Sequence, residues 1–367
     1  MLALSYYAHA DVSQEAYRVY NRLNGVPPSS QVLTKMVDEF NQGNSLNAAL
    51  IAIDDEQGRF YRSTVRKMVA PWTNESGAVR VPLNDFTATV MGIIRDELPY
   101  HRVLWDDIIY TVDAPLPDYS LRNNDHYQQA EEQGLDLRQK LKLAQPSLLT
   151  RLNADTVSGV LTSYSFARAF YNAGTNRAAV RFSFKPFLCM DVEQLSDVTR
   201  PDNRVRRDVS RAPGGDSSVY KSKCVGCHAG MDALAGAFAY LDYNDDDGLI
   251  FNPLAVGQKF NRNEHEFPYG YITHDDSWKN LWVHGPNHVL GWKGQTEGSG
   301  VKSYGYMLSQ SQQFARCSVT QVLSTVCQLE EGAAETQSLI DQLSLSFAKD
   351  YNLKRVFAQA ALACRGS

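Results

Sequence analysis

Apolar residues recur at the spacing of an α-helix through the first half of the chain. One set follows Ser29, whose hydroxyl can cap a helix N-terminus, and comprises Val32, Met36, Val37 and Phe40. A second set follows Asn84 and comprises Phe86, Val90, Ile93, Ile94 and Leu98. Because Pro99 cannot continue a helix, the second helix is predicted to end just before it.

Helical spacing continues in later segments, and no segment alternates long enough to require a large sheet. A short helix is predicted between Asn124 and Gly134. Further helical segments are predicted at 135–152, 155–171, 301–329 with a break, and 334–363. Residues 59–65 are predicted to pair as a minor strand. The expected fold class is mainly α.

Two segments lack an apolar period and are predicted to be loops. Residues 196–218 hold two prolines and two glycines, which predicts a linker or long loop. Residues 251–292 are rich in Asn, Gly and Pro, yet they also carry aromatic residues that favour an ordered loop. These aromatic residues include Phe267, Tyr269, Tyr271, Trp278 and Trp282.

The overall charge excludes some classes of partner. A net charge of −5 over 367 residues gives no basic field, so we expect no nucleic-acid partner. No apolar run reaches the roughly 20 residues of a membrane-spanning helix, so a protein that is not transmembrane is expected.

The first ten residues are apolar and end in Ala8-His9-Ala10, which has the small-x-small form of a signal-peptidase site. Residues 1–10 are therefore interpreted as the remnant of a signal peptide. This interpretation predicts a periplasmic or secreted bacterial protein.

One short motif carries specific chemistry. Cys224 and Cys227 stand three positions apart, as the attachment of two thiols to the vinyl groups of one haem requires, and His228 follows at once. The motif predicts one covalent haem c with His228 as the proximal iron ligand. A thioredoxin-like dithiol would need a βαβ unit around the motif, and a zinc site would need a second ligand pair. Neither is visible in the sequence.

The motif completes the expected organisation of the chain. The fold is predicted to be a helical body with a C-terminal cytochrome c-like haem module and long ordered loops. The N-terminal helical domain is expected at 11–195, the linker or loop at 196–218, and the haem c-binding region at 219–367.

The ligand on the other face of the iron stays open at this stage. Met307, His288 and His284 follow His228 at distances along the chain that suit a distal ligand. Met307 also has the helical spacing of a core residue, and the two histidines can be ordinary loop residues. An iron without a strong distal protein ligand is the remaining alternative.

Basic residues gather just before the motif. Residues 200–223 hold seven basic and three acidic side chains. Arginines in this position can pair with haem propionates. A solvated basic loop is the alternative.

An acidic turn follows the motif. Asp242, Asn244 and Asp246 supply alternating carboxylate and amide oxygens, which suit calcium. Gly248 comes one position late for an EF-hand loop. An acidic turn held by its own backbone contacts is therefore the alternative.

Four cysteines remain outside the motif. Cys189, Cys317, Cys327 and Cys364 permit three disulfide pairings in an oxidising compartment, or they can be buried thiols. Cys317 and Cys327 cannot bond along one continuous helix, because ten residues of rise separate them by about 15 Å.

The run from Cys224 to Tyr243 resembles the haem-bearing module of the planctomycete-type cytochrome c proteins, which are exported bacterial proteins built of domains of unknown function. Segments 97–111, 159–189 and 304–327 fit the same resemblance. Familiar members carry Asp-Pro-Leu-Gly where this chain has Asp232-Ala233-Leu234-Ala235. The resemblance implies a helical haem protein outside the cytoplasmic membrane, and it implies no settled reaction.

Three functions are therefore expected in order of preference. The first is the transfer of single electrons between redox partner proteins. The second is a haem-dependent oxidoreductase or peroxidase with an open distal site lined by Trp278, Trp282, His284 and His288. The third is a structural or surface-assembly protein whose haem mainly fixes the fold.

Overall fold

The structure is a computed structural model that describes residues 11–172, 174–327 and 334–365. It is mainly helical, as the apolar spacing predicts, and the strands of the described ranges form three two-stranded sheets. The expected signal remnant, residues 1–10, lies outside the described residues. Among the helices that are described, none combines the length and the apolar composition that crossing a bilayer requires.

The helices and strands follow one another without a repeat. The α-helices are α1 (Val12–Asn24), α2 (Ser30–Asn41), α3 (Ser45–Ile53), α4 (Arg66–Val69), α5 (Asp85–Arg95), α6 (Asp125–Glu132), α7 (Leu137–Lys140), α8 (Pro146–Leu149), α9 (Tyr164–Phe170), α10 (Arg177–Leu188), α11 (Ser217–Val219), α12 (Val225–Ala235), α13 (Gly300–Gln310), α14 (Gln312–Cys327), α15 (Ala334–Phe347) and α16 (Leu353–Ala363). The strands are β1 (Ile109–Val112), β2 (Leu141–Ala144), β3 (Leu241–Asn244), β4 (Gly248–Phe251), β5 (Ser277–Lys279) and β6 (Glu297–Ser299).

Side-chain caps begin two of the predicted helices, whereas Asn124 precedes α6 without a side-chain cap. The Ser29 hydroxyl accepts a hydrogen bond from the backbone N–H of Val32 at the start of α2, and Asn84 does the same for Thr87 in α5. Nearly every residue of α5 is buried, so this helix lies at the centre of the core. Gly92 of α5 is needed there, because a Cβ at this position would lie 2.1 Å from the ring of Tyr110.

Local predictions are wrong at 59–65, at 135–152 and within 334–363, where α15 ends at Phe347 and α16 begins at Leu353. Residues 59–65 do not form a strand, since Phe60–Val65 is a π-helix whose buried residues face the core. Residues 135–152 are not continuously helical, since Leu141–Ala144 is β2 and pairs antiparallel with β1. The Arg95 guanidinium donates a 2.7 Å hydrogen bond to the Leu141 carbonyl oxygen, which holds the start of β2 against the end of α5. These contacts come from distant segments, so local spacing does not reveal them.

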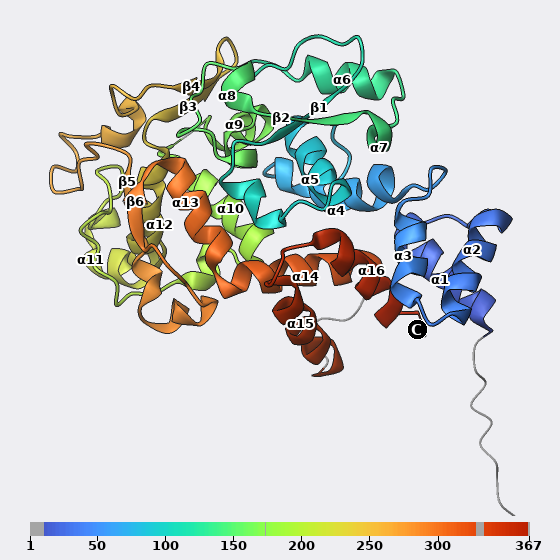
Figure 1. Cartoon of the computed structure of the whole chain (residues 1–367). Helices are drawn as coiled ribbons and strands as arrows, with labels where there is room; N and C mark the ends of the chain where they lie inside the picture. The colour runs from blue at the N-terminus through green and yellow to red at the C-terminus, as the bar shows by residue number, and fades with distance from the viewer. Residues whose placement is uncertain (1–10, 173, 328–333, 366–367) are drawn as a thin grey trace, which may run out of the picture.

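The two ends of the described chain lie side by side. In Figure 1, α1, α2 and α3 form one end of the molecule, with α16 beside them, and α12 lies toward the opposite end. One hydrophobic cluster contains residues from Ala16 in α1 to Cys364 after α16. The boundaries predicted at 195 and 219 stay predictions. The hydrophobic cluster contains residues from both sides of them.

The segment 196–218 is packed against α12, the helix that carries Cys227 and His228. Val205 and Val209 from this loop form a small hydrophobic cluster with Val225 and Ala229 of α12. Tyr220 completes the cluster. The loop therefore covers one face of α12.

The four cysteines outside the motif form two disulfides. Cys189 pairs with Cys317, which ties the end of α10 to α14. Cys327 pairs with Cys364, which ties the end of α14 to the end of α16. Cys317 and Cys327 do lie on one helix and do not bond to each other.

We expect the longer-range disulfide to contribute more stability. The sequence separations of 128 and 37 residues imply a difference of about 1 kcal/mol in loop-closure entropy, and each bond contributes roughly 2–5 kcal/mol. The double variant Cys189→Ala, Cys317→Ala should therefore unfold at lower urea concentration than Cys327→Ala, Cys364→Ala, and both should unfold below the parent. The reverse order would contradict the entropic account.

Candidate haem-attachment site

The motif cysteines and histidine lie at the N-terminus of α12. A single π-helical turn, Tyr220–Cys224, precedes α12, and Cys224 occupies the N-cap position. Cys227 and His228 follow in the first turn. Both thiols are half-buried, and the His228 side chain is 25% exposed, so all three groups are partly accessible. Isolated π-helical turns are frequent at functional sites.

Small residues let neighbouring segments approach α12 closely. A Cβ at Gly230 would lie 2.2 Å from the Trp282 indole, and a Cβ at Gly226 would lie 2.1 Å from the Ser196 hydroxyl. The backbone N–H of Asp197 also donates a 3.0 Å hydrogen bond to the Gly226 carbonyl oxygen. The start of the loop 196–218 and the aromatic loop therefore both rest on the motif helix.

A buried carboxylate holds the imidazole of His228. Asp232 lies one helical turn after His228, and its Oδ1 is 3.1 Å from the His228 Nδ1. The Asp232 side chain is fully buried. An imidazole that donates its Nδ1–H to a carboxylate keeps the Nε2 lone pair free, which is the arrangement seen at many metal-ligating histidines.

An arginine keeps Asp232 charged. The Arg177 guanidinium, at the start of α10, makes two 2.6 Å hydrogen bonds to the two oxygens of Asp232. Burial opposes ionisation of Asp232, but Arg177, His228 and Arg206 outweigh it and hold the pKa of that carboxyl well below its usual range. These contacts favour the carboxylate form of Asp232, which can accept a hydrogen bond from the Nδ1 of His228.

These residues fit a covalently attached haem. Two thiols stand three positions apart at a helix start, and the next residue is an imidazole whose Nδ1 is already engaged. The thiols are also chemically distinct from the other cysteines of the chain, because the other four are all in disulfides. Burial raises the pKa of the Cys227 thiol, and a hydrogen bond to Ser196 partly opposes this shift.

The loop that carries His284 and His288 lies beside α12. Trp282 contacts Gly230, and the Asn287 amide donates a 2.8 Å hydrogen bond to the Leu195 carbonyl oxygen. Both histidines are exposed. The Nδ1 of His288 lies 2.8 Å from the carbonyl oxygen of Gly285 in the same loop, a contact that leaves Nε2 free.

Met307 lies in the hydrophobic core. It is 1% exposed in α13, and its sulfur accepts a 3.5 Å hydrogen bond from the Asn280 amide. The helical spacing of Met307 predicts a core residue, and its burial confirms this prediction. The structure places Met307 and the two histidines on different elements, and the choice of a distal ligand stays a prediction.

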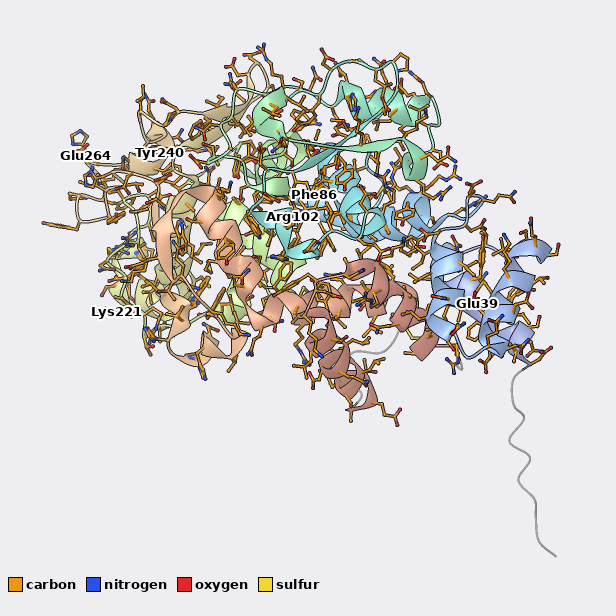
Figure 2. The ribbon with its side chains drawn as sticks, viewed as in Figure 1. Glu39, Phe86, Arg102, Lys221, Tyr240 and Glu264 are labelled. Atoms are coloured by element: carbon orange, nitrogen blue, oxygen red, sulfur yellow. A yellow bond between two sulfur atoms is a disulfide. The ribbon has the colours of Figure 1, made fainter. Side chains whose placement is uncertain are left out.

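The arginines before the motif contact protein groups. Arg207 pairs with Glu264 at 3.2 Å, and Arg200 pairs with Asp197 at 2.9 Å. Figure 2 shows Glu264 and Lys221 on the same side of the molecule as α12. Arg206 is 1% exposed, and burial lowers its pKa to about 10. Pairing of this loop with haem propionates stays a prediction.

The acidic turn joins β3 to β4. Asp242 pairs with Lys259 at 2.7 Å, and Asn244 accepts the backbone N–H groups of Asp246 and Asp247. The Asn244 side chain therefore holds the turn by accepting from its backbone N–H groups. Within the described ranges, no three His, Cys, Asp or Glu side chains are arranged to hold a metal ion, and calcium at Asp242, Asn244 and Asp246 stays a prediction.

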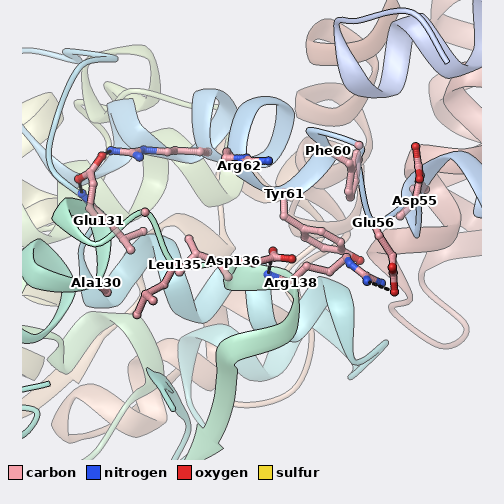
Figure 3. A pocket seen from close by; sticks show the side chains of 16 residues that line it. Asp55, Glu56, Phe60, Tyr61, Arg62, Ala130, Glu131, Leu135, Asp136 and Arg138 are labelled. Atoms are coloured by element: carbon pink, nitrogen blue, oxygen red, sulfur yellow. Dashed lines mark hydrogen bonds and ion pairs between the residues drawn. The ribbon is translucent and has the colours of Figure 1, made fainter. Parts of the chain in front are cut away.

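A separate cavity of about 210 Å³ lies far from the motif, among the π-helix at 60–65, α6 and α7. Figure 3 shows Tyr61 beside Arg138 and Glu56 in this cavity. Arg138 pairs with Glu56 at 3.0 Å, and Arg66 pairs with Glu131 at 2.6 Å. Four of the charged side chains that line the cavity are thus paired with one another, and the cavity gives no reason to expect a ligand of one particular charge.

Sequence reasoning missed the residues that support His228. Asp232 stands four positions after His228, and this spacing on a helix could have identified it. Arg177 and Asp208 have no such local signal. Arg177 is 55 residues away from Asp232 in the sequence, and Asp208 is 31 residues away from Arg177.

Comparison with known proteins adds no assignment to this geometry. Neither a protein-family model, nor a curated protein, nor a solved structure matches the chain.

We expect Gly230→Ala to destabilise the site. The added methyl group must displace the buried Trp282 indole, which should cost about 1–3 kcal/mol of unfolding free energy despite the higher helix propensity of alanine. Gly226→Ala is the matched control in the same helix, since the Ser196 hydroxyl that it meets can rotate away. Urea unfolding measures both variants, and an equal or larger loss in the control would contradict the packing described.

Proposed function

We propose that this chain is an exported mono-haem c-type cytochrome that transfers single electrons between redox partner proteins. The observation that carries the proposal is the division of the six cysteines. Four of them form two disulfides, which are typical of exported proteins, and the two left as thiols are those of the Cys224–His228 motif. The proposal also draws on the resemblance to planctomycete-type cytochromes c.

The chain's own residues divide the work of holding the haem. Cys224 and Cys227 would form the two thioether bonds, and His228 would present Nε2 to the iron. Asp232 holds the imidazole by its other nitrogen. The bound haem supplies the one-electron chemistry, and the half-buried position of the motif leaves a route for electron exchange at the surface.

In this proposal the distal ligand of the electron carrier would come from His288. Its Nδ1 is held by a backbone carbonyl and its Nε2 is free, as a second imidazole ligand requires. Met307 would first have to leave the core and break its contact with Asn280. The His288 side chain is exposed, so it has no such buried contact to lose.

A haem-dependent oxidoreductase with an open distal site is the second candidate. The burial of Met307 in the core supports it, because its sulfur would have to leave its contact with Asn280 before it could bind the iron. A structural role for the haem remains the third hypothesis.

Mass spectrometry tests the attachment directly. Protein exported from a host with an intact cytochrome c maturation system should have the polypeptide mass plus one haem. Cys224→Ser, Cys227→Ser should have the bare mass, and Cys189→Ser, Cys317→Ser serves as the control that loses two cysteines but keeps the haem. The bare mass for the parent protein would overturn the proposal.

Absorption and EPR spectra separate the two leading functions. The electron carrier predicts a low-spin, six-coordinate iron that does not bind carbon monoxide or cyanide. His288→Ala should convert it to a high-spin iron that binds both, whereas His284→Ala and Met307→Leu should leave the spectra unchanged. A high-spin iron in the parent protein would instead support the enzyme with an open distal site.

A further inference from the structure

Each carboxylate oxygen of Asp232 has two polar contacts. Oδ1 accepts from the Nε of Arg177 at 2.6 Å and lies 3.1 Å from the Nδ1 of His228. Oδ2 accepts from the Nη2 of Arg177 at 2.6 Å and from the backbone N–H of Arg206 at 3.1 Å. With four contacts in fixed directions, the carboxylate cannot rotate away from the imidazole.

Arg177 is itself held from the other side. Asp208, in the loop before the motif, accepts from its Nη1 at 2.6 Å and from its Nη2 at 2.8 Å. The neighbouring Asn176 donates two hydrogen bonds to backbone carbonyls, those of Phe238 and Leu241, which anchors the start of α10. The guanidinium is therefore a fixed bridge between two carboxylates.

The charges of this cluster act on the imidazole in opposite directions. An anionic Asp232 would draw the Nδ1–H of His228 toward itself, which would increase the electron density at Nε2 and favour ferric over ferrous iron once a haem is bound. Arg177 shares the same Oδ1 and so weakens Asp232 as an acceptor. The balance between these two contacts sets how strongly His228 would donate to iron.

We propose that Asp232 is a positioning residue that fixes His228 with Nδ1 as donor and lowers the reduction potential of the iron, and that Arg177 moderates this effect. The inference rests on the proposed function, because it concerns a haem bound through His228. It goes further in assigning the tuning of the iron to a carboxylate and an arginine outside the motif.

The test is the reduction potential of the haem-loaded protein and its variants. Asp232→Asn keeps the shape but removes the anion, so its potential should rise by about 59 mV or more, the equivalent of a tenfold loss of preference for ferric iron. Asp208→Asn is the matched control, since it removes the other carboxylate partner of Arg177 and leaves His228 untouched. Its potential should move far less.

Arg177→Lys supplies a second, independent arm if Asp232→Asn does not fold. Lysine keeps the positive charge but loses the two-point grip on Oδ1 and Oδ2, so Asp232 becomes a stronger acceptor and the potential should fall. Shifts of opposite sign in the two variants cannot arise from general loosening of the site.

The outcomes separate the inference from the function beneath it. A parent protein without haem overturns the proposed function. A haem-loaded Asp232→Asn with the potential of the Asp208→Asn control, or an Arg177→Lys variant whose potential does not fall, overturns the role of Asp232 while haem attachment stands.

Discussion

The bidentate ion pair between Arg177 and Asp232 is the interaction on which the arrangement of the site depends. It joins the start of α10 to the middle of α12, and Asp208 extends it to the loop that covers α12. A buried carboxylate without a charge partner would be protonated and could donate rather than accept. The Arg177 guanidinium favours the anion of Asp232, and that anion can accept a hydrogen bond from the Nδ1 of His228.

The rest of the fold keeps these groups in position. Cys189–Cys317 ties the far end of α10 to α14, and α14 in turn packs between α10 and the helices near the chain ends. Gly226 and Gly230 allow two loops to lie directly on the motif helix. The helix that presents the two thiols is therefore packed against α10 and both loops, while its N-terminal end keeps the reactive groups partly exposed.

Local sequence signals identified much of this structure. Capping residues such as Ser29 and Asn84 mark real helix starts, and the apolar spacing predicts α5, α13, α14 and α16. The motif that begins at Cys224 could be recognised from the spacing of its own residues alone. What could not be predicted depends on contacts between distant segments: the disulfide pairing, strand β2 and the grip of Arg177 on Asp232. The strand predicted at 59–65 is wrong for a physical reason. The β-branched and aromatic residues of this segment suit a strand, whereas their burial against the core favours the π-helix that the structure shows.

The most direct measurement is a crystal structure of the protein purified after export with haem maturation. The account predicts thioether bonds at both motif sulfurs, the Nε2 of His228 on iron, and the Nδ1 of His228 within hydrogen-bonding distance of Asp232. A polypeptide in which Cys224 and Cys227 are bonded to each other, with no iron at His228, would contradict it.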